Sequence, residues 1–522
     1  MHSHLLVGFD RGGVRGRHSP PPPSRGLNSQ PGLAIGVPAA PLLGMPSTMP
    51  TQVVIFGASG DLTARKLVPA LFTAFHEGHL PPTTQLVGVA RRPWDDAGFR
   101  EHLQGTVGKI NEHARWSEFL GGVRYVKTNL DTADDYRALT ASLDAAAGQQ
   151  VNRVFYLAVK PDLFLPSVAH MHAAGLLTQS DTGPRRRVVV EKPFGNDLGS
   201  ATVLNQSLLK LLGEDQLYRI DHYLGKETVQ NTIVFRFRNA LFEPLWNQKY
   251  VEMVQITVGE AIGMENGRGG FYDTAGAARD ILQNHLLQVL ALVAMEAPSS
   301  LAAKDIRDEK VKVLRALRGF DGLDPRKHIV RGQYEGYRAE TGVDPKSETE
   351  TYIAARTFID NWRWGGVPFL LRTGKHLPAR FTSVKIHFRM PPHTLFGGPD
   401  ECHLRPNAIT LRIQPNDGID LAFDVKEPGQ GLVIQPAKLN FNYAERFQKP
   451  APDAYERLLI DVINGDQSLF IRSDEIEQSW RWTDSLRECM RNTPLYLYAR
   501  NSWGPFASDD LFGECEGKWV TG

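Results

Sequence analysis

Cysteine, charge imbalance and long apolar runs are all scarce in this chain of 522 residues, and each scarcity excludes a class of protein. The three cysteines, Cys402, Cys489 and Cys515, are far apart and odd in number, so we expect neither a disulfide framework nor a cysteine metal site. This cysteine usage fits a reducing compartment such as the cytoplasm. Lys and Arg number 59 against 58 Asp and Glu, which argues against nucleic acid as a partner. No apolar run reaches about 18 residues, so we expect no transmembrane helix and no membrane partner.

The first 48 residues differ in composition from the rest. They hold a single acid, Asp10, and the run Pro20–Pro23 among many Gly and Ser. Such a segment cannot build a hydrophobic core and is typical of disorder. Two other interpretations are a translation start at Met45 or Met49 and an Arg-rich transit peptide.

A glycine turn between a strand and a helix opens the next region. Gln52–Phe56 is a short β-branched apolar run, typical of a buried parallel strand, and Gly57-Ala58-Ser59-Gly60-Asp61-Leu62 follows it directly. A helical pattern then runs from about Asp61 to His76. Glycine lets the backbone approach a phosphate, and a helix N-terminus attracts one. The spacing is not GxGxxG, so an ordinary tight turn between strand and helix is the alternative.

The end of the second strand indicates which dinucleotide would bind. Gln85–Ala90 is the predicted strand, and Arg91-Arg92 follow it. An acid at this place favours the free 2′-hydroxyl of NAD, whereas arginine pairs with the 2′-phosphate of NADP. The pattern therefore favours NADP; two solvated loop arginines are the alternative.

The alternation of strands and helices continues to about residue 215. Arg153–Val159 and Arg187–Glu191 are further predicted strands, with a helix to about Gly175 between them. Lys192 leaves the carboxyl end of the last strand, where ligands of open parallel sheets bind. We therefore predict an α/β Rossmann-like dinucleotide-binding domain over residues 49–215, after an extension over 1–48.

Residues 216–522 show a different pattern. Longer strand-like runs appear, and no helix separates the last three, which should therefore be antiparallel. We predict an α+β domain with one large mixed or antiparallel sheet. The runs are Tyr250–Glu260, Val367–Arg372, Ser383–Arg389, Ile409–Gln414 and Ile419–Val425.

Two segments carry the chemistry of this second region. In the run RIDHYLGKE (219–227), a helical backbone would place His222 and Lys226 on one face, and such a pair indicates an anion site. A helix predicted to begin near Asp273 and to run to Gln288 carries His285 among dense apolar residues. The alternatives are a surface helix start for the first segment and a structural core histidine for the second.

The ordered motifs GASGDL, EKPFG, RIDHYLGKE, RDILQNH, RTGK and QPN closely resemble those of glucose-6-phosphate dehydrogenases, from about residue 51 to the end. The resemblance implies oxidation of glucose 6-phosphate to 6-phospho-glucono-1,5-lactone with NADP, the first oxidative step of the pentose phosphate pathway. Members of the family are commonly dimers or tetramers, so we expect a cytoplasmic homodimer or homotetramer; because the nicotinamide would take the hydride, no metal is required. Two departures are Lys160-Pro161, where relatives usually carry a proline pair, and one extra residue between Glu260 and Arg268.

The resemblance also implies roles for individual residues. His285 would be the general base, oriented by Asp221. His222, Tyr223 and Lys226 would bind the 6-phosphate. The further substrate contacts would be Lys192, Glu260, Asp280, Lys375, Arg380 and Gln414. The cofactor contacts would be Gly57, Ser59, Gly60, Asp61, Leu62, Arg91 and Lys192.

Two other functions stay open from the sequence. One is a dehydrogenase of free glucose or of other hexose phosphates, which the anion pair His222 and Lys226 argues against. The other is a catalytically silent NADP-binding regulatory protein, which the intact Asp221, Lys226 and His285 argue against.

Overall fold

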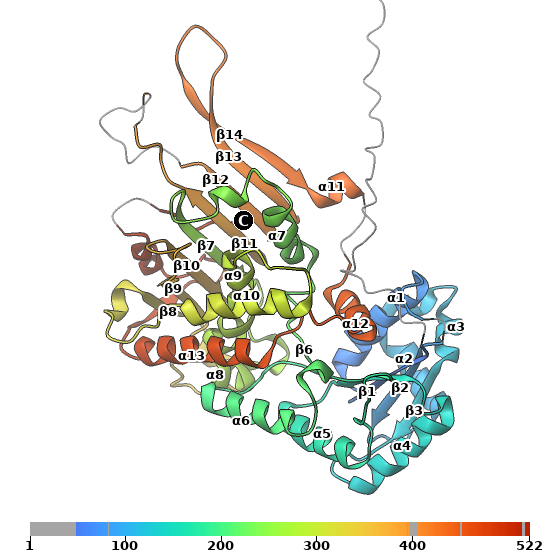
Figure 1. Ribbon diagram of the computed structural model, residues 1–522. Coiled ribbons are helices and arrows are strands. Elements are labelled where there is room, and N and C mark those ends of the chain that lie inside the picture. Colours follow the sequence, from blue (N-terminus) through green and yellow to red (C-terminus); the bar gives the residue numbers. More distant parts are fainter. Residues whose placement is uncertain are drawn as a thin grey trace, which may run out of the picture. The chain divides into compact units, whose positions relative to one another are not determined.

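The computed structural model describes residues 49–81, 83–393, 395, 406–448, 452–513 and 517–521 (Figure 1). The predicted extension over 1–48 lies outside these residues, as do Cys402 and Cys515. Cys489 is a free thiol. Within the described ranges, no helix is both long and apolar enough to cross a bilayer.

The first sheet has six parallel strands in the order β3-β2-β1-β4-β5-β6. This is the strand order of a doubly wound dinucleotide-binding fold. Every residue of β1, β4 and β5 is buried, as expected where helices cover both faces of a parallel sheet. The strands are β1 (Thr51–Phe56), β2 (Gln85–Ala90), β3 (Val123–Lys127), β4 (Asn152–Leu157), β5 (Arg186–Val190) and β6 (Leu217–Arg219).

The predicted Rossmann-like half is therefore confirmed as a fold. Its boundary between residues 215 and 216 stays a prediction, although the sheet itself continues through β6. The helices of this half are α1 (Val68–His76), preceded by the π-helical turn η1 (Thr63–Leu67), α2 (Asp96–Thr106), α3 (Trp116–Gly121), α4 (Ala133–Ala147), α5 (Phe164–Ala173) and α6 (Leu198–Leu209).

The second sheet has nine strands in the order β14-β13-β12-β11-β7-β10-β9-β8-β15. β7 and β10 are parallel, as are β8 and β15, and the other neighbours are antiparallel, so the predicted large mixed sheet is confirmed. The strands are β7 (Val251–Gly259), β8 (Ile329–Tyr334), β9 (Tyr352–Phe358), β10 (Pro368–Gly374), β11 (Phe381–Phe388), β12 (Ala408–Gln414), β13 (Gly418–Lys426), β14 (Ile434–Asn442) and β15 (Leu495–Tyr498).

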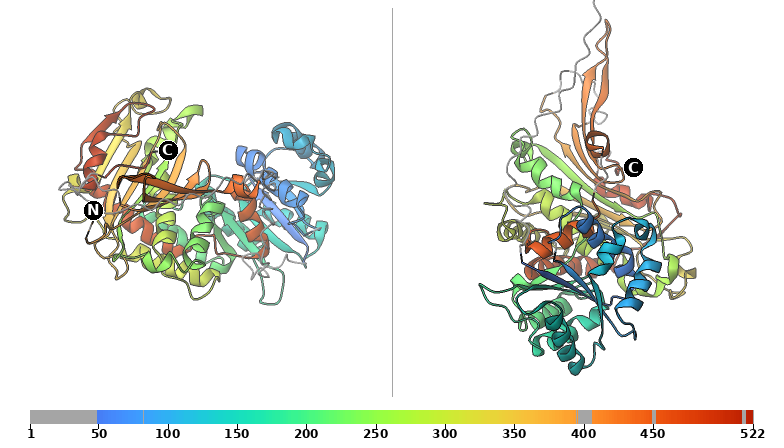
Figure 2. Two further views of the ribbon diagram at one scale, coloured as in Figure 1. Left: turned by 90° about the horizontal axis from the view of Figure 1, so that it is seen from above. Right: turned by 90° about the vertical axis from the view of Figure 1, so that its right-hand side faces the viewer.

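One continuous stretch of helix lies against the middle of this sheet. The π-helical segment η7 (Ala278–Leu286) packs on β7 and β10 and continues directly into α9. The other helices are α7 (Glu227–Phe237), α8 (Gly269–Ala277), α9 (Leu287–Ala294), α10 (Ala303–Ala316), α11 (Tyr443–Phe447), α12 (Ala454–Asn464) and α13 (Ser473–Met490). The long hairpin of β13 and β14 extends beyond the other strands of the sheet (Figure 2).

Two late segments return to the first sheet. α12 packs against α1, with which it lies side by side in Figure 1. Farther along, Ile471 forms an isolated antiparallel bridge with Arg219 at the end of β6. Residues from the last quarter of the chain therefore complete the surroundings of the six-stranded sheet.

Candidate active site

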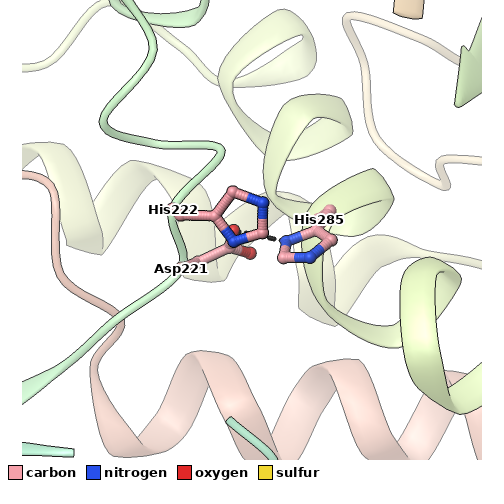
Figure 3. Close-up of side chains that lie close together, drawn as sticks. All are labelled: Asp221, His222 and His285. Atoms are coloured by element: carbon pink, nitrogen blue, oxygen red, sulfur yellow. Dashed lines mark hydrogen bonds and ion pairs between the residues drawn. The ribbon is translucent and has the colours of Figure 1, made fainter. Parts of the chain in front are cut away.

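Asp221 and His285 form a buried pair. His285 Nδ1 lies 2.5 Å from Asp221 Oδ1, each side chain is 1% exposed, and Figure 3 shows the two side chains facing each other with His222 beside them. Burial opposes the charge on Asp221, but the His285 imidazole lowers the pKa of that carboxyl to about 2. An ionised carboxylate can only accept, so Nδ1 of His285 carries the proton and Nε2 has its lone pair free.

His285 is neutral at neutral pH. Burial lowers its pKa below the ordinary 6.5, although the Asp221 carboxylate acts in the opposite direction. Nε2 of His285 lies 3.0 Å from Lys192 Nζ, an ammonium that can only donate. A neutral imidazole with an accepting Nε2 is the form that can remove a proton from a hydroxyl.

The helical interpretation of RIDHYLGKE is wrong. The run is the end of β6 followed by turns, and α7 begins only at Glu227. The reason is local, because the Asp221 carboxylate accepts the Tyr223 N–H (2.9 Å), which is a turn-forming contact that competes with a helix. Lys226 is the residue that precedes the first helical residue of α7. His222 and Lys226 nevertheless line one pocket.

The helix that carries His285 also differs from the prediction. It does not run unbroken from Asp273, because Gly276 has φ +67° and breaks the helix one residue before the end of α8. A Cβ at Gly276 would lie 2.4 Å from a Glu350 oxygen. Glu350 accepts the N–H of Ala277 at its backbone oxygen and that of Ala278 at its carboxylate, each at 3.0 Å. Glu350 therefore caps the start of the helix that positions Asp280 and His285.

Lysines and carboxylates alternate beside the pair. Lys192 Nζ bonds to the Asp280 backbone oxygen (2.8 Å) and approaches Asp280 Oδ1 (3.3 Å). Lys375 forms ion pairs with Glu260 and with Asp280 (Oδ2, 3.2 Å). Burial disfavours the charges, but the two lysines lower the pKa of Asp280, and the two acids raise that of Lys375. These groups offer both donors and acceptors to a polyhydroxylated ligand.

A pocket of about 510 Å³ opens at His222 and Lys226. Lys226 Nζ donates to Gln414 Oε1 (2.9 Å), and Gln414 in turn donates to Thr382 (2.8 Å). Burial lowers the pKa of His222 well below 6.5, so it serves as a neutral hydrogen-bonding group rather than as a second cation. The exposed Arg380 also lines the pocket. Tyr223 does not line this pocket; its ring stacks on that of His285, with 4.4 Å between the ring centres.

A second pocket, of about 870 Å³, lies at the carboxyl ends of the first sheet. The glycine turn forms part of its wall through Gly57, Ser59, Gly60 and Leu62, and the end of β2 adds Arg91 and Arg92. The volume is in the range that small-molecule and cofactor sites occupy. The carboxylate of Asp61 is mostly exposed and pairs with Arg65 at 2.6 Å; Asp61 does not line the pocket.

The structure shows how the two arginines are presented. The Tyr125 hydroxyl bonds to the backbone oxygens of Ala90 (2.9 Å) and Arg92 (2.8 Å) and so fixes the end of β2. Arg92 lies over the ring of Trp94, at 5.4 Å from its centre. Arg91 is exposed at the pocket.

Sequence reasoning missed several groups at the two pockets. Glu191 lines the larger pocket and accepts from the Tyr156 hydroxyl (2.5 Å), and burial raises its pKa. Tyr455 lines the smaller pocket, as do Lys66 and Asp453, which pair at 2.8 Å. No local sequence pattern predicts Tyr455 or Asp453 as site residues, since they lie at the pocket only because α12 packs against α1. Lys66 lies in the predicted helix after the glycine turn and could have been weighed as a cation near an anion site.

A doubly wound sheet with a pocket at its strand ends, next to a neutral histidine held by an ionised aspartate, defines a dinucleotide-dependent dehydrogenase. The comparisons with known proteins narrow this class. Residues 54–231 match the family model described as glucose-6-phosphate dehydrogenase, NAD binding domain, and residues 233–520 match that of the C-terminal domain. The chain belongs to the glucose-6-phosphate dehydrogenase family.

Individual relatives cover most of the chain. The glucose-6-phosphate 1-dehydrogenase of Treponema pallidum is 43% identical over 91% of this chain and 96% of its own length. A solved glucose-6-phosphate dehydrogenase in complex with its substrate glucose 6-phosphate is 35% identical and superimposes with a TM-score of 0.82, covering 91% of this chain and 100% of the other. The enzyme from Mycobacterium avium gives 36% identity and a TM-score of 0.79 over the same shares.

Proposed function

We propose that this chain oxidises D-glucose 6-phosphate at C1 to 6-phospho-D-glucono-1,5-lactone with reduction of NADP. The observation that carries the proposal is the neutral His285, whose Nε2 is available while Nδ1 donates to the ionised Asp221. Family membership supports the same reaction, which is the first oxidative step of the pentose phosphate pathway.

The larger pocket fits a dinucleotide. A Cβ at Gly57, where φ is +80°, would lie 2.2 Å from the Ala158 backbone oxygen, so only glycine allows this close turn beneath the pocket. We infer that the Gly57–Gly60 turn faces the pyrophosphate and that Arg91 pairs with the 2′-phosphate. When bound, the nicotinamide supplies the hydride acceptor.

His285 moves the proton in this scheme. Its Nε2 accepts the proton of the C1 hydroxyl, and Asp221 stabilises the imidazolium that forms. Lys192, now 3.0 Å from Nε2, would give up this position to the hydroxyl and keep its contacts with Asp280. The low exposure of the pair excludes water from the transferred proton.

The remaining contacts hold the sugar. Lys226 and His222 bind the 6-phosphate, with Arg380 and Gln414 at the walls of the same pocket and the Tyr223 hydroxyl in contact with Gln414. Glu260, Asp280 and Lys375 bind the ring hydroxyls. Glu260 lies beside Lys375 in spite of the extra residue that follows it in the sequence. We propose, as predicted from the sequence, that the reaction requires no metal ion.

The test is reduction of NADP by glucose 6-phosphate, followed by absorbance, with free glucose and with NAD in parallel. We expect turnover with the phosphorylated sugar and NADP. His285→Ala should lower kcat by about 10²–10⁴-fold, the usual contribution of a general base. Equal rates with free glucose would favour the hexose dehydrogenase alternative. Folded protein that binds NADP without turnover would favour a silent regulatory protein.

We further propose a cytoplasmic homodimer or homotetramer. β14 is an edge strand of the nine-stranded sheet, and large apolar side chains are exposed on it and on the turn before it. They are Leu432, Val433, Ile434 and Leu439. Light scattering of the purified chain checks the assembly, and cell fractionation checks the location.

A further inference from the structure

Three residues outside both pockets bring metal-ligating atoms together. They are Glu77 and His79, just after α1, and Glu456 in the first turn of α12. Their ligating atoms all lie within 4.8 Å of one another. His79 Nδ1 lies 3.5 Å from Glu77 Oε2 and 3.9 Å from Glu456 Oε1. Ligands about 2.0–2.1 Å from a tetrahedral Zn²⁺ lie about 3.4 Å apart, so small side-chain shifts would suffice.

Glu456 is the unusual member. It is 6% exposed, and within the described part of the chain its carboxylate receives no hydrogen bond; the His79 imidazole approaches it at 3.9 Å. Asp453, one turn earlier, is in contrast satisfied by Lys66 and by the Tyr455 N–H. A buried carboxylate without a donor is costly unless it takes up a proton or a cation neutralises it.

The backbone holds the other two ligands in place. His79 N–H bonds to the Ala74 backbone oxygen (2.8 Å), and Glu77 N–H to that of Thr73 (2.9 Å), so both residues are fixed to the end of α1. The side chains of Glu77 and His79 are each 50% exposed, which leaves a route for an ion from water.

We propose that Glu77, His79 and Glu456 form a binding site for a divalent transition metal, Zn²⁺ being the ion that one imidazole and two carboxylates suit best. The imidazole argues against Mg²⁺ and Ca²⁺, which prefer oxygen ligands. A bound ion would join α1, which follows the dinucleotide turn, to α12, whose neighbouring residue Tyr455 lines the smaller pocket. The site is therefore distinct from the proposed active site but attached to its wall.

The experiment is calorimetric titration of the full, tag-free chain with Zn²⁺ after chelator treatment and dialysis. Removing a ligand should weaken binding by at least ~10-fold, since even outer-shell changes cost that much. We expect this loss in His79→Ala and in Glu456→Gln, and none in His393→Ala, which removes an exposed histidine elsewhere. Glu77→Gln, at an exposed position, provides a further ligand variant should Glu456→Gln fail to fold.

Two results would overturn the proposal. One is the absence of Zn²⁺ binding to the wild-type chain. The other is unchanged affinity in His79→Ala and Glu77→Gln, which would place the ion elsewhere, for instance at Asp221, His222 and His285, whose ligating atoms also cluster. A parallel activity assay separates this case, because an ion on those three residues would inhibit turnover equally in wild type and His79→Ala.

Discussion

Replacing Asp221 by Asn should impair His285 as a base, although the Asn side chain has nearly the same shape as the Asp side chain. The carboxylate lies 2.5 Å from His285 Nδ1, and both side chains are 1% exposed, so little solvent screens the pair. At about 4 Å between charges and an effective dielectric constant of about 20, the attraction for the imidazolium is about 4 kcal/mol. Losing it corresponds to a fall in kcat of about 10³-fold, within the range of about 10²–10⁴ for a general base.

Asn also allows the wrong tautomer. Its amide can donate to Nδ1 of His285, which would leave the proton on Nε2, where the substrate hydroxyl has to be deprotonated. The KM for glucose 6-phosphate should change little, because the phosphate is held in the pocket of Lys226 and not by Asp221. Initial rates of NADP reduction over a range of substrate concentrations separate the two constants.

The pH profile gives an independent reading of the same pair. His285 accepts a proton only while neutral, and burial lowers its pKa below 6.5. Activity should thus persist as pH falls through 6.5 and be lost only below it. The Asp221 carboxylate raises the pKa of His285, so Asp221→Asn should shift this acidic limb to still lower pH.

The control for Asp221→Asn is Asp461→Asn, which changes another carboxylate that is 1% exposed but lies on α12, paired with Arg457. It should keep kcat near the wild-type value, and thermal melts should confirm that both variants fold. A kcat for Asp221→Asn within about threefold of wild type would refute the role of the pair, since that ratio is worth only about 0.7 kcal/mol.

Three further substitutions test the pockets and the helix. Lys226→Ala should raise the KM for glucose 6-phosphate by about 10–100-fold, the worth of one charge-assisted bond, while the exposed Lys304→Ala should not; an unchanged KM would remove Lys226 from the phosphate site. Arg91→Ala should weaken NADP by ~10-fold and NAD much less, and titrations showing equal losses would contradict a 2′-phosphate contact. Glu350→Ala should cost about 1–3 kcal/mol of stability and lower kcat, because it frees the buried Ala278 N–H, and Glu350→Gln should restore both; normal kcat and melting temperature in Glu350→Ala would refute the cap.

Local patterns predicted the strands well where burial is uniform. β1, β2 and β5 lie within one residue of the predicted runs, because continuous apolar sequences next to turns have few alternative structures. β14 was missed because its sequence, Ile434–Asn442, is mixed and its side chains are mostly exposed or partly exposed. Its partner β13 was predicted as the strand-like run Ile419–Val425.

The predicted active-site residues converge, but their backbone could not be derived from periodicity. The argument for an anion site took a helical backbone through 219–227 as its condition, yet the Asp221 carboxylate binds the Tyr223 N–H and turns the chain. The break at Gly276 depends on Glu350, which comes from a loop far along the chain. Contacts between distant residues cannot be predicted from a local sequence pattern. For the same reason the position of Tyr455 at the smaller pocket was not predicted.

The packing of α12 against α1 also determines when the folding of the first half can be completed. Lys66, in the turn η1 before α1, pairs with Asp453, just before α12, although the two residues are 387 positions apart in the sequence. During synthesis the six-stranded sheet is made early. The face of α1 that packs against α12 stays exposed to solvent until most of the chain has been made. A fragment ending near residue 231 would thus lack part of its packing, and the long separation slows the final closure. The dinucleotide-binding half is therefore synthesised first, but its packing is completed only after α12 has been made.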